Sequence, residues 1–293
     1  LKGGRRTWDH GLNTAGTPLM SRAAAGVNRR GFFLSGQHLA GECDMAVPMQ
    51  DSPRIYIDSS EAGAFLPERE IVLGADHARY LGTVLRLGPD APVRVFNAVD
   101  GEWEAVLLGT RKDRGSLRLV ARCRAPVVPR GPVLMFAPLK RDATDLVIRM
   151  GTEMGVSCFV PVTTIRTNTH RINPERLRAI AIEAAEQCER LDVPEICPLQ
   201  PLLAAVENWP ENKPLFAALE RHDAAPPGRL SAPYGLLVGP EGGFAPEERR
   251  WLSAHDRIRP LSLGSLVLRA DTAACAGLAR LALSGECSIS TEF

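Results

Sequence analysis

Two glycine-containing loops carry the residues of this chain that are best suited to hold a small molecule. Residues 239–243 read GPEGG, and residues 263–269 read LGSLVLR. Glycine permits positive φ and lets backbone N–H groups come close to a ligand, so both loops could bind a cofactor through main-chain atoms. Arg269 ends the second loop. Its guanidinium could stabilise negative charge that develops in a reaction, or it could form an ion pair with Asp271 or Glu241.

Each loop is predicted to join a buried strand to a helix. The apolar runs 235–238 and 259–263 are short enough for strands that are buried on both faces. Pro246 stands where the first helical residue of the next element is expected. Asp271 or Thr272 is the predicted N-cap of a final helix that is rich in small residues. On the glycines alone, two ordinary strand-to-helix turns of an α/β domain are the favoured explanation of the pattern.

The elements that position these loops are expected in residues 125–293. The patterns predict strands at 133–137, 157–162 and 214–218, and helices at 142–154 and 174–190. Alternation of strands and helices is typical of a parallel sheet with helices on both faces. The fold class predicted for this part of the chain is therefore α/β.

The N-terminal part reads differently. Between residues 49 and 124, short strand patterns surround one helix that we expect Asp76 to cap, which indicates a small β-barrel. The proline-rich stretch 122–131 suggests the boundary to the α/β domain. Residues 1–48 lack helical or strand periodicity, and we expect a disordered leader or an overextended start.

Composition excludes several classes of protein. The 293 residues carry a net charge of +1 with 45% hydrophobic residues, so the chain can build a core but has no general basic excess. Its 7 cysteines form no CxxC pair, and we expect neither a zinc ribbon nor any other metal site. No apolar run approaches the roughly 20 residues that cross a bilayer. A nucleotide hydrolase is disfavoured because the GxxxxGK[ST] loop is absent.

Several motifs together resemble the RsmE family of SPOUT methyltransferases. GPEGG is followed one strand–helix unit later by LGSLVLRADTA, and PRIY at 53–56, YLGTVLRL at 80–87 and EAAEQ at 183–187 look like other blocks of that family. The resemblance covers about residues 49–285. It implies S-adenosylmethionine bound in a trefoil-knotted α/β domain, a PUA-like RNA-binding barrel at 49–124, a cytoplasmic homodimer, and methylation of N3 of one uridine in 16S rRNA of the small ribosomal subunit.

The resemblance also implies roles for individual residues. Arg269 is the expected catalytic residue, since it would stabilise the charge on a deprotonated uracil. The expected cofactor-binding residues are Leu219, Gly239, Pro240, Glu241, Gly242, Leu263, Gly264, Leu268 and Thr272. The expected RNA-binding residues are Arg54, Arg86, Lys140, Arg149, Glu186 and Gln187.

The chain departs from the family at two places. Ser265 and Leu266 stand where members commonly have proline and arginine, and Asp271 stands where many have glutamate. The first departure removes a basic residue near the cofactor loop, which implies a weaker enzyme or compensation by Lys140, Arg141 or Arg149. Two alternatives stay open: a SPOUT enzyme that methylates a ribose 2′-OH of tRNA, and an RNA-binding relative without catalytic activity.

Overall fold

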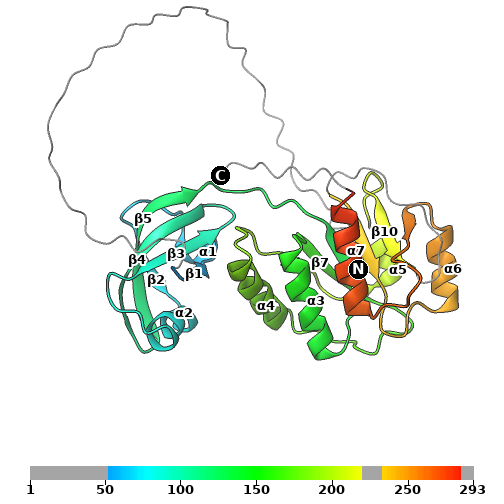
Figure 1. The fold of residues 1–293 in the computed structure, drawn as a ribbon, viewed down its shortest axis with the longest axis horizontal. Coiled ribbons are helices and arrows are strands. Elements are labelled where there is room, and N and C mark those ends of the chain that lie inside the picture. Colours follow the sequence, from blue (N-terminus) through cyan, green and yellow to red (C-terminus); the bar gives the residue numbers. More distant parts are fainter. Residues whose placement is uncertain (1–51, 220–232, 285–293) are drawn as a thin grey trace, which may run out of the picture. The chain divides into compact units, whose positions relative to one another are not determined.

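The computed structural model describes residues 52–219 and 233–284, which contain two β-sheets with their helices (Figure 1). The expectation of a disordered leader at 1–48 lies outside the described residues. Among the helices that are described, none is both long and apolar enough to cross a membrane.

The larger sheet is parallel throughout. Its strands run in the order β12-β10-β11-β6-β7-β8, and a short strand β9 also pairs with β7. The strands are β6 (Val133–Phe136), β7 (Cys158–Thr163), β8 (Glu195–Ile196), β9 (Gln200–Pro201), β10 (Leu215–Ala218), β11 (Gly235–Val238) and β12 (Ile258–Leu261). The predicted strands of the α/β part are present, whereas β8 and β9 were not foreseen from the sequence.

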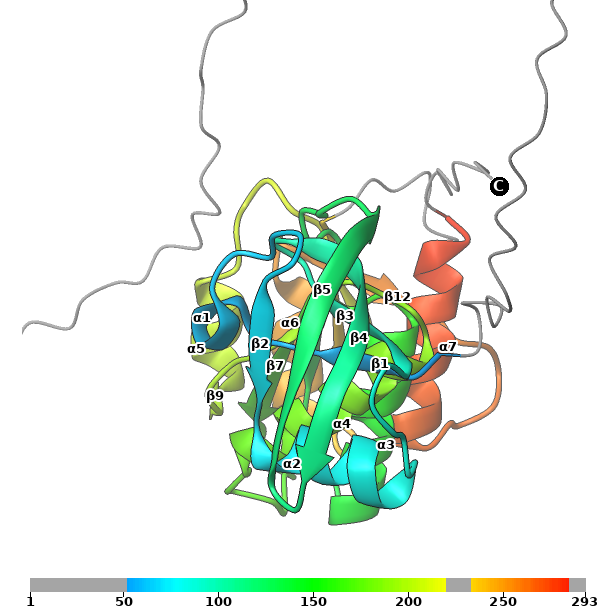
Figure 2. The same cartoon turned by 90° about the vertical axis from the view of Figure 1, so that its left-hand side faces the viewer.

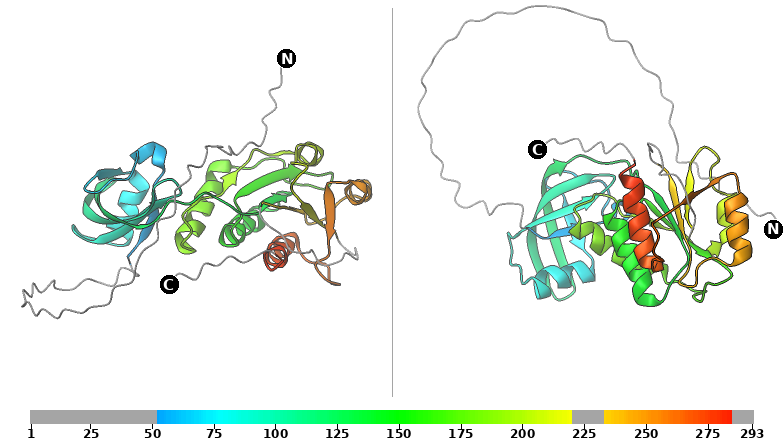
Figure 3. Two further views of the ribbon diagram at one scale, coloured as in Figure 1. Left: turned by 90° about the horizontal axis from the view of Figure 1, so that it is seen from above. Right: turned by 45° about the vertical axis from the view of Figure 1, so that its right-hand side comes forward.

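Helices cover both faces of this sheet, as Figure 3 shows from above. One face carries α3 (Arg141–Glu153), α4 (Pro174–Gln187) and α7 (Ala270–Ala282), and the other carries α5 (Leu202–Glu207) and α6 (Pro246–Ala254). Successive strand residues point to opposite faces, so Leu134 and Phe136 of β6 enter one core and Met135 the other. Two buried faces explain why the strands are continuous apolar runs.

The first residues of three helices can be compared with their predictions. Asn173 caps α4 as predicted, and its side-chain oxygen accepts a hydrogen bond from the backbone N–H of Arg176 at 3.1 Å. Helix α6 begins at Pro246, also as predicted. The prediction for α7 was wrong, because the helix begins at Ala270 and its N-cap is Arg269.

The smaller sheet holds five strands in the order β1-β3-β4-β5-β2 and faces the viewer in Figure 2. Its strands are β1 (Arg54–Tyr56), β2 (Glu70–Leu73), β3 (Pro92–Asn97), β4 (Gly101–Arg111) and β5 (Arg114–Arg124), and only the β1–β3 pair is parallel. The accompanying helices are α1 (Ser59–Ala62), α2 (Ala75–Arg79) and the π-helix η2 (Tyr80–Val84). Gly74 rather than Asp76 is the N-cap of α2.

This sheet has a hydrophobic core of its own. Val93 and Val95 of β3, Leu107 of β4, and Leu117 and Leu119 of β5 are buried in it. Their alternation along the strands is the signal that predicted short strands here. The pattern of strands with a helix between 75 and 84 is thus confirmed, whereas α1 was not expected.

Candidate active site

The loops after β10, β11 and β12 meet at one edge of the parallel sheet. These three strands are neighbours in the order β12-β10-β11, so their carboxyl ends lie side by side. Ligands of open α/β sheets bind at such an edge. The three loops and the start of α7 enclose a pocket. Most of the predicted cofactor-binding residues line it: Leu219, Gly239, Pro240, Glu241, Leu263, Gly264 and Leu268.

The glycines of these loops stand where the backbone needs them. Gly264 has φ +109° and Gly243 has φ +65°, values that side chains disfavour. The N–H of Gly243 donates to the carbonyl of Pro240 at 2.9 Å and closes the turn. A Cβ on Gly239 would stand 3.1 Å from the ring of Phe244. The loops are therefore built around close backbone contacts.

Two predicted cofactor-binding residues lie outside this pocket. Gly242 is exposed, and a Cβ placed on it would meet only the side chain of Arg166, at 3.6 Å. Thr272 is exposed in the first turn of α7, and its backbone N–H donates to Asp271 Oδ1 at 2.7 Å. Neither residue is among those that line the pocket.

Arg269 lies in an adjoining cavity that shares Glu241 and Ala270 with the pocket. Lys140, Asn168 and Asp271 also line this cavity. Arg269 is exposed and has no ion pair within the part of the chain that the structure describes.

The carboxylate of Glu241 instead accepts a hydrogen bond from the backbone N–H of Lys140 at 3.1 Å. The expected alternative, a structural salt bridge from Arg269 to Asp271 or Glu241, is not formed among the described residues. The guanidinium of Arg269 is left available beside the pocket.

The loop after β7, residues 164–173, forms another wall of the site and was missed in the sequence. Arg166 Nη1 donates to the carbonyl of Gly242 at 2.8 Å, which joins this loop to the GPEGG loop. The backbone N–H of Ile165 donates to Glu248 Oε1 at 2.8 Å. A signal was present, because polar and basic residues follow a buried strand at the edge where ligands bind.

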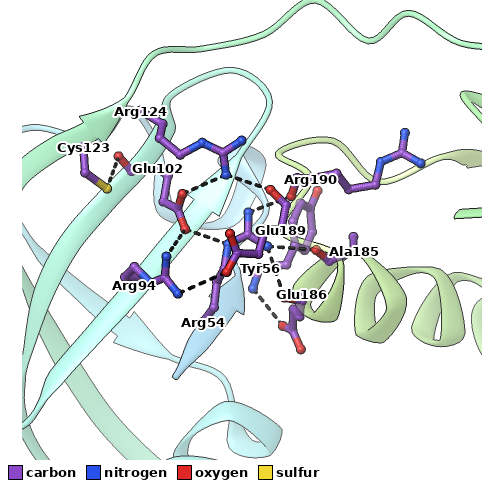
Figure 4. A network of polar contacts seen from close by, with 10 residues as sticks. All are labelled: Arg54, Tyr56, Arg94, Glu102, Cys123, Arg124, Ala185, Glu186, Glu189 and Arg190. Atoms are coloured by element: carbon purple, nitrogen blue, oxygen red, sulfur yellow. Dashed lines mark hydrogen bonds and ion pairs between the residues drawn. The ribbon is translucent and has the colours of Figure 1, made fainter. Parts of the chain in front are cut away.

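Arg54 is not placed to bind RNA, which corrects the sequence-based expectation. Figure 4 shows its guanidinium between Glu102 of β4 and the end of α4. Its Nε donates to Glu102 Oε1 at 2.6 Å, Nη1 to the carbonyl of Ala185 at 2.8 Å, and Nη2 to the carbonyl of Arg190 at 2.7 Å. The guanidinium carbon also lies 3.5 Å from the ring centroid of Phe96. With 4% of its side chain exposed, Arg54 is a buried structural cation.

The other predicted RNA-binding residues divide into two groups. Glu186 is half-buried at the end of α4, and its Oε1 accepts a hydrogen bond from the backbone N–H of Tyr56 at 2.9 Å. Burial raises the pKa of the Glu186 carboxyl. The hydrogen bond between Glu186 and Tyr56 therefore joins α4 to β1. The side chains of the second group are all exposed: Arg86, Lys140, Arg149 and Gln187.

One group of possible metal ligands occurs among the described residues. Ligand atoms of Cys158, Glu195 and Cys197 lie within 4.8 Å of one another, and the two thiol sulfurs are 3.2 Å apart. Both cysteines are packed in the core beneath α5, whereas Glu195 is exposed. The hydrogen bond with the sulfur of Cys197, together with burial, raises the pKa of the Cys158 thiol, which favours the protonated form of Cys158. The expectation that the protein needs no metal stays a prediction.

Comparison with known proteins defines the class to which this fold and site belong. A family model described as an RNA methyltransferase domain matches residues 129–282, which include the whole parallel sheet and both glycine loops. A putative methyltransferase from Legionella pneumophila, solved with bound S-adenosylmethionine, is 29% identical with a TM-score of 0.68, over 80% of this chain and 98% of that one. The chain is an RNA methyltransferase by family.

The curated relatives make the assignment specific. Ribosomal RNA small subunit methyltransferase E from Rickettsia conorii is 33% identical over 240 residues, which cover 79% of this chain and 96% of the relative. The protein of the same name from Synechocystis is 30% identical over 228 residues, 73% of each chain. This chain belongs to the ribosomal RNA small subunit methyltransferase E family, as its motifs indicated. A member from Neisseria gonorrhoeae, 24% identical with a TM-score of 0.67, shares the fold.

Proposed function

We propose that this protein transfers a methyl group from S-adenosylmethionine to N3 of one uridine in 16S rRNA of the small ribosomal subunit. One observation carries the proposal. The pocket built by the two glycine loops adjoins, at Glu241 and Ala270, the cavity lined by Arg269, which has no ion pair among the described residues. A methyl donor in the first space and a base in the second would meet where the two spaces join.

The residues of the pocket fit this cofactor. Leu219, Leu263 and Leu268 offer apolar surface for an adenine ring, as is usual in cofactor sites. The backbone of Gly264 has open space around it, so it can donate or accept hydrogen bonds at close range. Bound S-adenosylmethionine would supply an electrophilic methyl group, so the protein itself needs no nucleophile and no metal. Its task is to hold donor and acceptor in line.

Arg269 would serve the acceptor. When the uracil N3–H loses its proton, negative charge spreads to the two carbonyl oxygens of the ring. A guanidinium held beside those oxygens lowers the energy of the charged state, and fixed cations of this kind often contribute the largest part of catalysis. Because Arg269 forms the N-cap of α7, its backbone is held by the helix while its side chain is free to face the base.

Further parts of the proposal concern assembly and the RNA. Residues 49–124 would form a PUA-like RNA-binding domain, and residues 125–293 a knotted SPOUT domain. Leu266 and Val267 are 79% and 60% exposed on the loop that lines the pocket, which supports burial of this apolar surface in a homodimer. We infer that the enzyme acts in the cytoplasm, where small ribosomal subunits are available.

Two other functions fit less well. Methylation of a tRNA ribose 2′-OH would require the same pocket, but the relatives named above are ribosomal RNA enzymes. An RNA-binding relative without activity would have no need for a cation beside a cofactor pocket that forms no ion pair within the described part of the chain.

Primer extension tests the reaction. Methylation at N3 blocks the Watson–Crick edge, so small ribosomal subunits that lack the modification should gain a reverse-transcriptase stop at one uridine after incubation with protein and S-adenosylmethionine. If methyl label entered tRNA and no stop appeared, the proposed substrate would be wrong. If calorimetry detected no cofactor binding, the enzymatic function itself would fail.

Arg269 variants test the catalytic role. Arg269→Ala should reduce methyl transfer by about 10²-fold or more, with cofactor affinity nearly unchanged, because the charge arises only during the reaction. Arg269→Lys should recover part, since an ammonium lacks the planar fork of the guanidinium. Arg250→Ala is a matched control: Arg250 is exposed on α6, and among the described residues its side chain hydrogen-bonds only to the carbonyl of Pro246 in its own helix, at 3.4 Å. Near-full turnover of the alanine variant would make Arg269 a structural residue.

A further inference from the structure

We propose that Arg141 and Arg171 form a binding site for an RNA phosphate next to the target nucleotide. The inference rests on the proposed function, since it extends the path of the RNA away from the methyl-transfer site. Arg141 begins α3, and Arg171 lies on the loop after β7. Both line a third cavity, whose volume is about 440 Å³. No role had been expected for Arg171.

The three cavities follow one another in order. The pocket of the glycine loops joins the Arg269 cavity at Glu241 and Ala270. The Arg269 cavity in turn shares Leu139 and Thr169 with the Arg141–Arg171 cavity. The Thr169 hydroxyl donates to the carbonyl of Leu139 at 3.0 Å and fixes their common wall. A nucleotide whose base lies beside Arg269 would therefore place its backbone toward the third cavity.

The charge of the third cavity suits a phosphate. Three arginines line it and no carboxylate does. One of the three, Arg176, is neutralised by an ion pair with Asp145. Arg141 and Arg171 have no ion pair or side-chain hydrogen bond within the described ranges 52–219 and 233–284. Two arginines without an ion pair among the described residues therefore line one cavity, and arginine is the side chain that binds phosphate oxygens through paired N–H groups.

Stability of the protein does not explain these arginines. Arg141 is the first residue of α3, where the helix dipole disfavours a cation, and the N-cap before it, Lys140, is also a cation. Arg171 is exposed on a loop. Both side chains would stabilise the folded protein only when an anion is bound beside them.

The loop that carries Arg171 is held firmly at its other end. The hydroxyl of Thr167 accepts a hydrogen bond from the backbone N–H of Thr164 at 2.9 Å, and both threonines are buried. Arg166 of the same loop donates to Gly242 beside the cofactor pocket. The phosphate site and the GPEGG loop therefore belong to one connected wall.

The test measures RNA binding separately from methyl transfer. A short, fluorescently labelled single-stranded RNA is titrated by anisotropy at several salt concentrations against the full chain and the variants Arg141→Ala, Arg171→Ala and Arg171→Lys. Arg250→Ala serves as the control for loss of one exposed arginine. Cofactor affinity and melting temperature are measured on the same samples and should stay unchanged.

Each alanine variant should bind the RNA about tenfold more weakly, the scale of one charge-assisted hydrogen bond to a phosphate. The slope of log K against log salt should fall by about 0.7 for each lost contact, a change that a merely structural role would not produce. Arg171→Lys should keep the slope and recover part of the affinity. Unchanged affinity and slope in both alanine variants would overturn the site.

The outcome separates this inference from the proposed function. If the unmutated protein puts no methyl group on uridine but both variants still lose RNA affinity, the proposed reaction fails and the phosphate site stands. If methyl transfer occurs and both variants bind RNA like the unmutated chain, only the phosphate site fails.

Discussion

Replacing Arg54 by methionine tests whether this residue serves the fold or the RNA. The side chain of Glu102 is 0% exposed, and that of Arg54 is 4% exposed, so the substitution leaves a buried carboxylate without its closest partner. Arg124 at 3.1 Å and Arg94 at 3.7 Å remain near Glu102. Breaking a buried ion pair typically costs about 3–5 kcal/mol, and the remaining arginines place this case at the low end.

A loss of about 3 kcal/mol should lower the melting temperature by about 6–12 °C, since about 2–4 °C corresponds to 1 kcal/mol in proteins of this size. Scanning calorimetry of the purified variant measures this change in melting temperature. The double variant Arg54→Met/Glu102→Gln should be less destabilised than the sum of the two single variants, because the second change removes the unpaired charge.

The opposite pattern would refute this reasoning. If Arg54→Met changed the melting temperature by less than about 2 °C but weakened RNA binding, Arg54 would act as the phosphate contact that its sequence position suggested. Arg86→Met is a suitable comparison, since Arg86 is exposed and has no ion pair among the described residues.

Three further predictions concern the pocket, pH and metal. Gly264→Ala should weaken S-adenosylmethionine binding at least tenfold in calorimetry, because φ +109° strains any side chain, whereas Gly242→Ala should leave it within about twofold. Burial holds the pKa of the Glu186 carboxyl above its ordinary value near 4.5. The free energy of unfolding should therefore fall as the pH rises from 4.5 through the raised pKa. The Glu186→Gln variant should be more stable than the unmutated protein at pH 7 and lose that advantage below pH 4.5. Chelator-treated protein should keep full activity, and a loss restored by Zn²⁺ would implicate Cys158 and its neighbours.

The elements that sequence predicted well are those with local causes. Asn173 followed by Pro174 starts α4 because a side-chain cap and a fixed φ act within a few residues. The strand β11 matches its prediction at both ends, since a short apolar run closed by a glycine turn has few other solutions. The need for glycine at position 264 was likewise predictable, because its positive φ is a local property of the turn.

The features that sequence missed depend on distant contacts. Arg54 is buried by an ion pair with Glu102 and a hydrogen bond to Ala185, a residue 131 positions away along the chain. The start of α7 was placed too late because Asp271 and Thr272 are good N-caps, yet the helix begins at Ala270, which the pocket and the core both contact. The order of residues alone shows neither that a side chain is buried nor that a helix begins at the wall of a pocket.

The distribution of the basic residues explains how a nearly neutral chain can bind RNA. With 35 basic and 34 acidic residues, the net charge of +1 gives no hint of a nucleic-acid partner. Many arginines are neutralised within the fold, as Arg54, Arg176 and Arg190 are by carboxylates. Net charge cannot reveal the cations around the two outer cavities that have no ion pair within residues 52–219 and 233–284: Lys140, Arg141, Arg171 and Arg269. If these four cations make the phosphate contacts, the binding affinity should fall only moderately with salt. Specificity for one uridine must then come from the shape of the cavities and from the second sheet, rather than from general attraction to RNA.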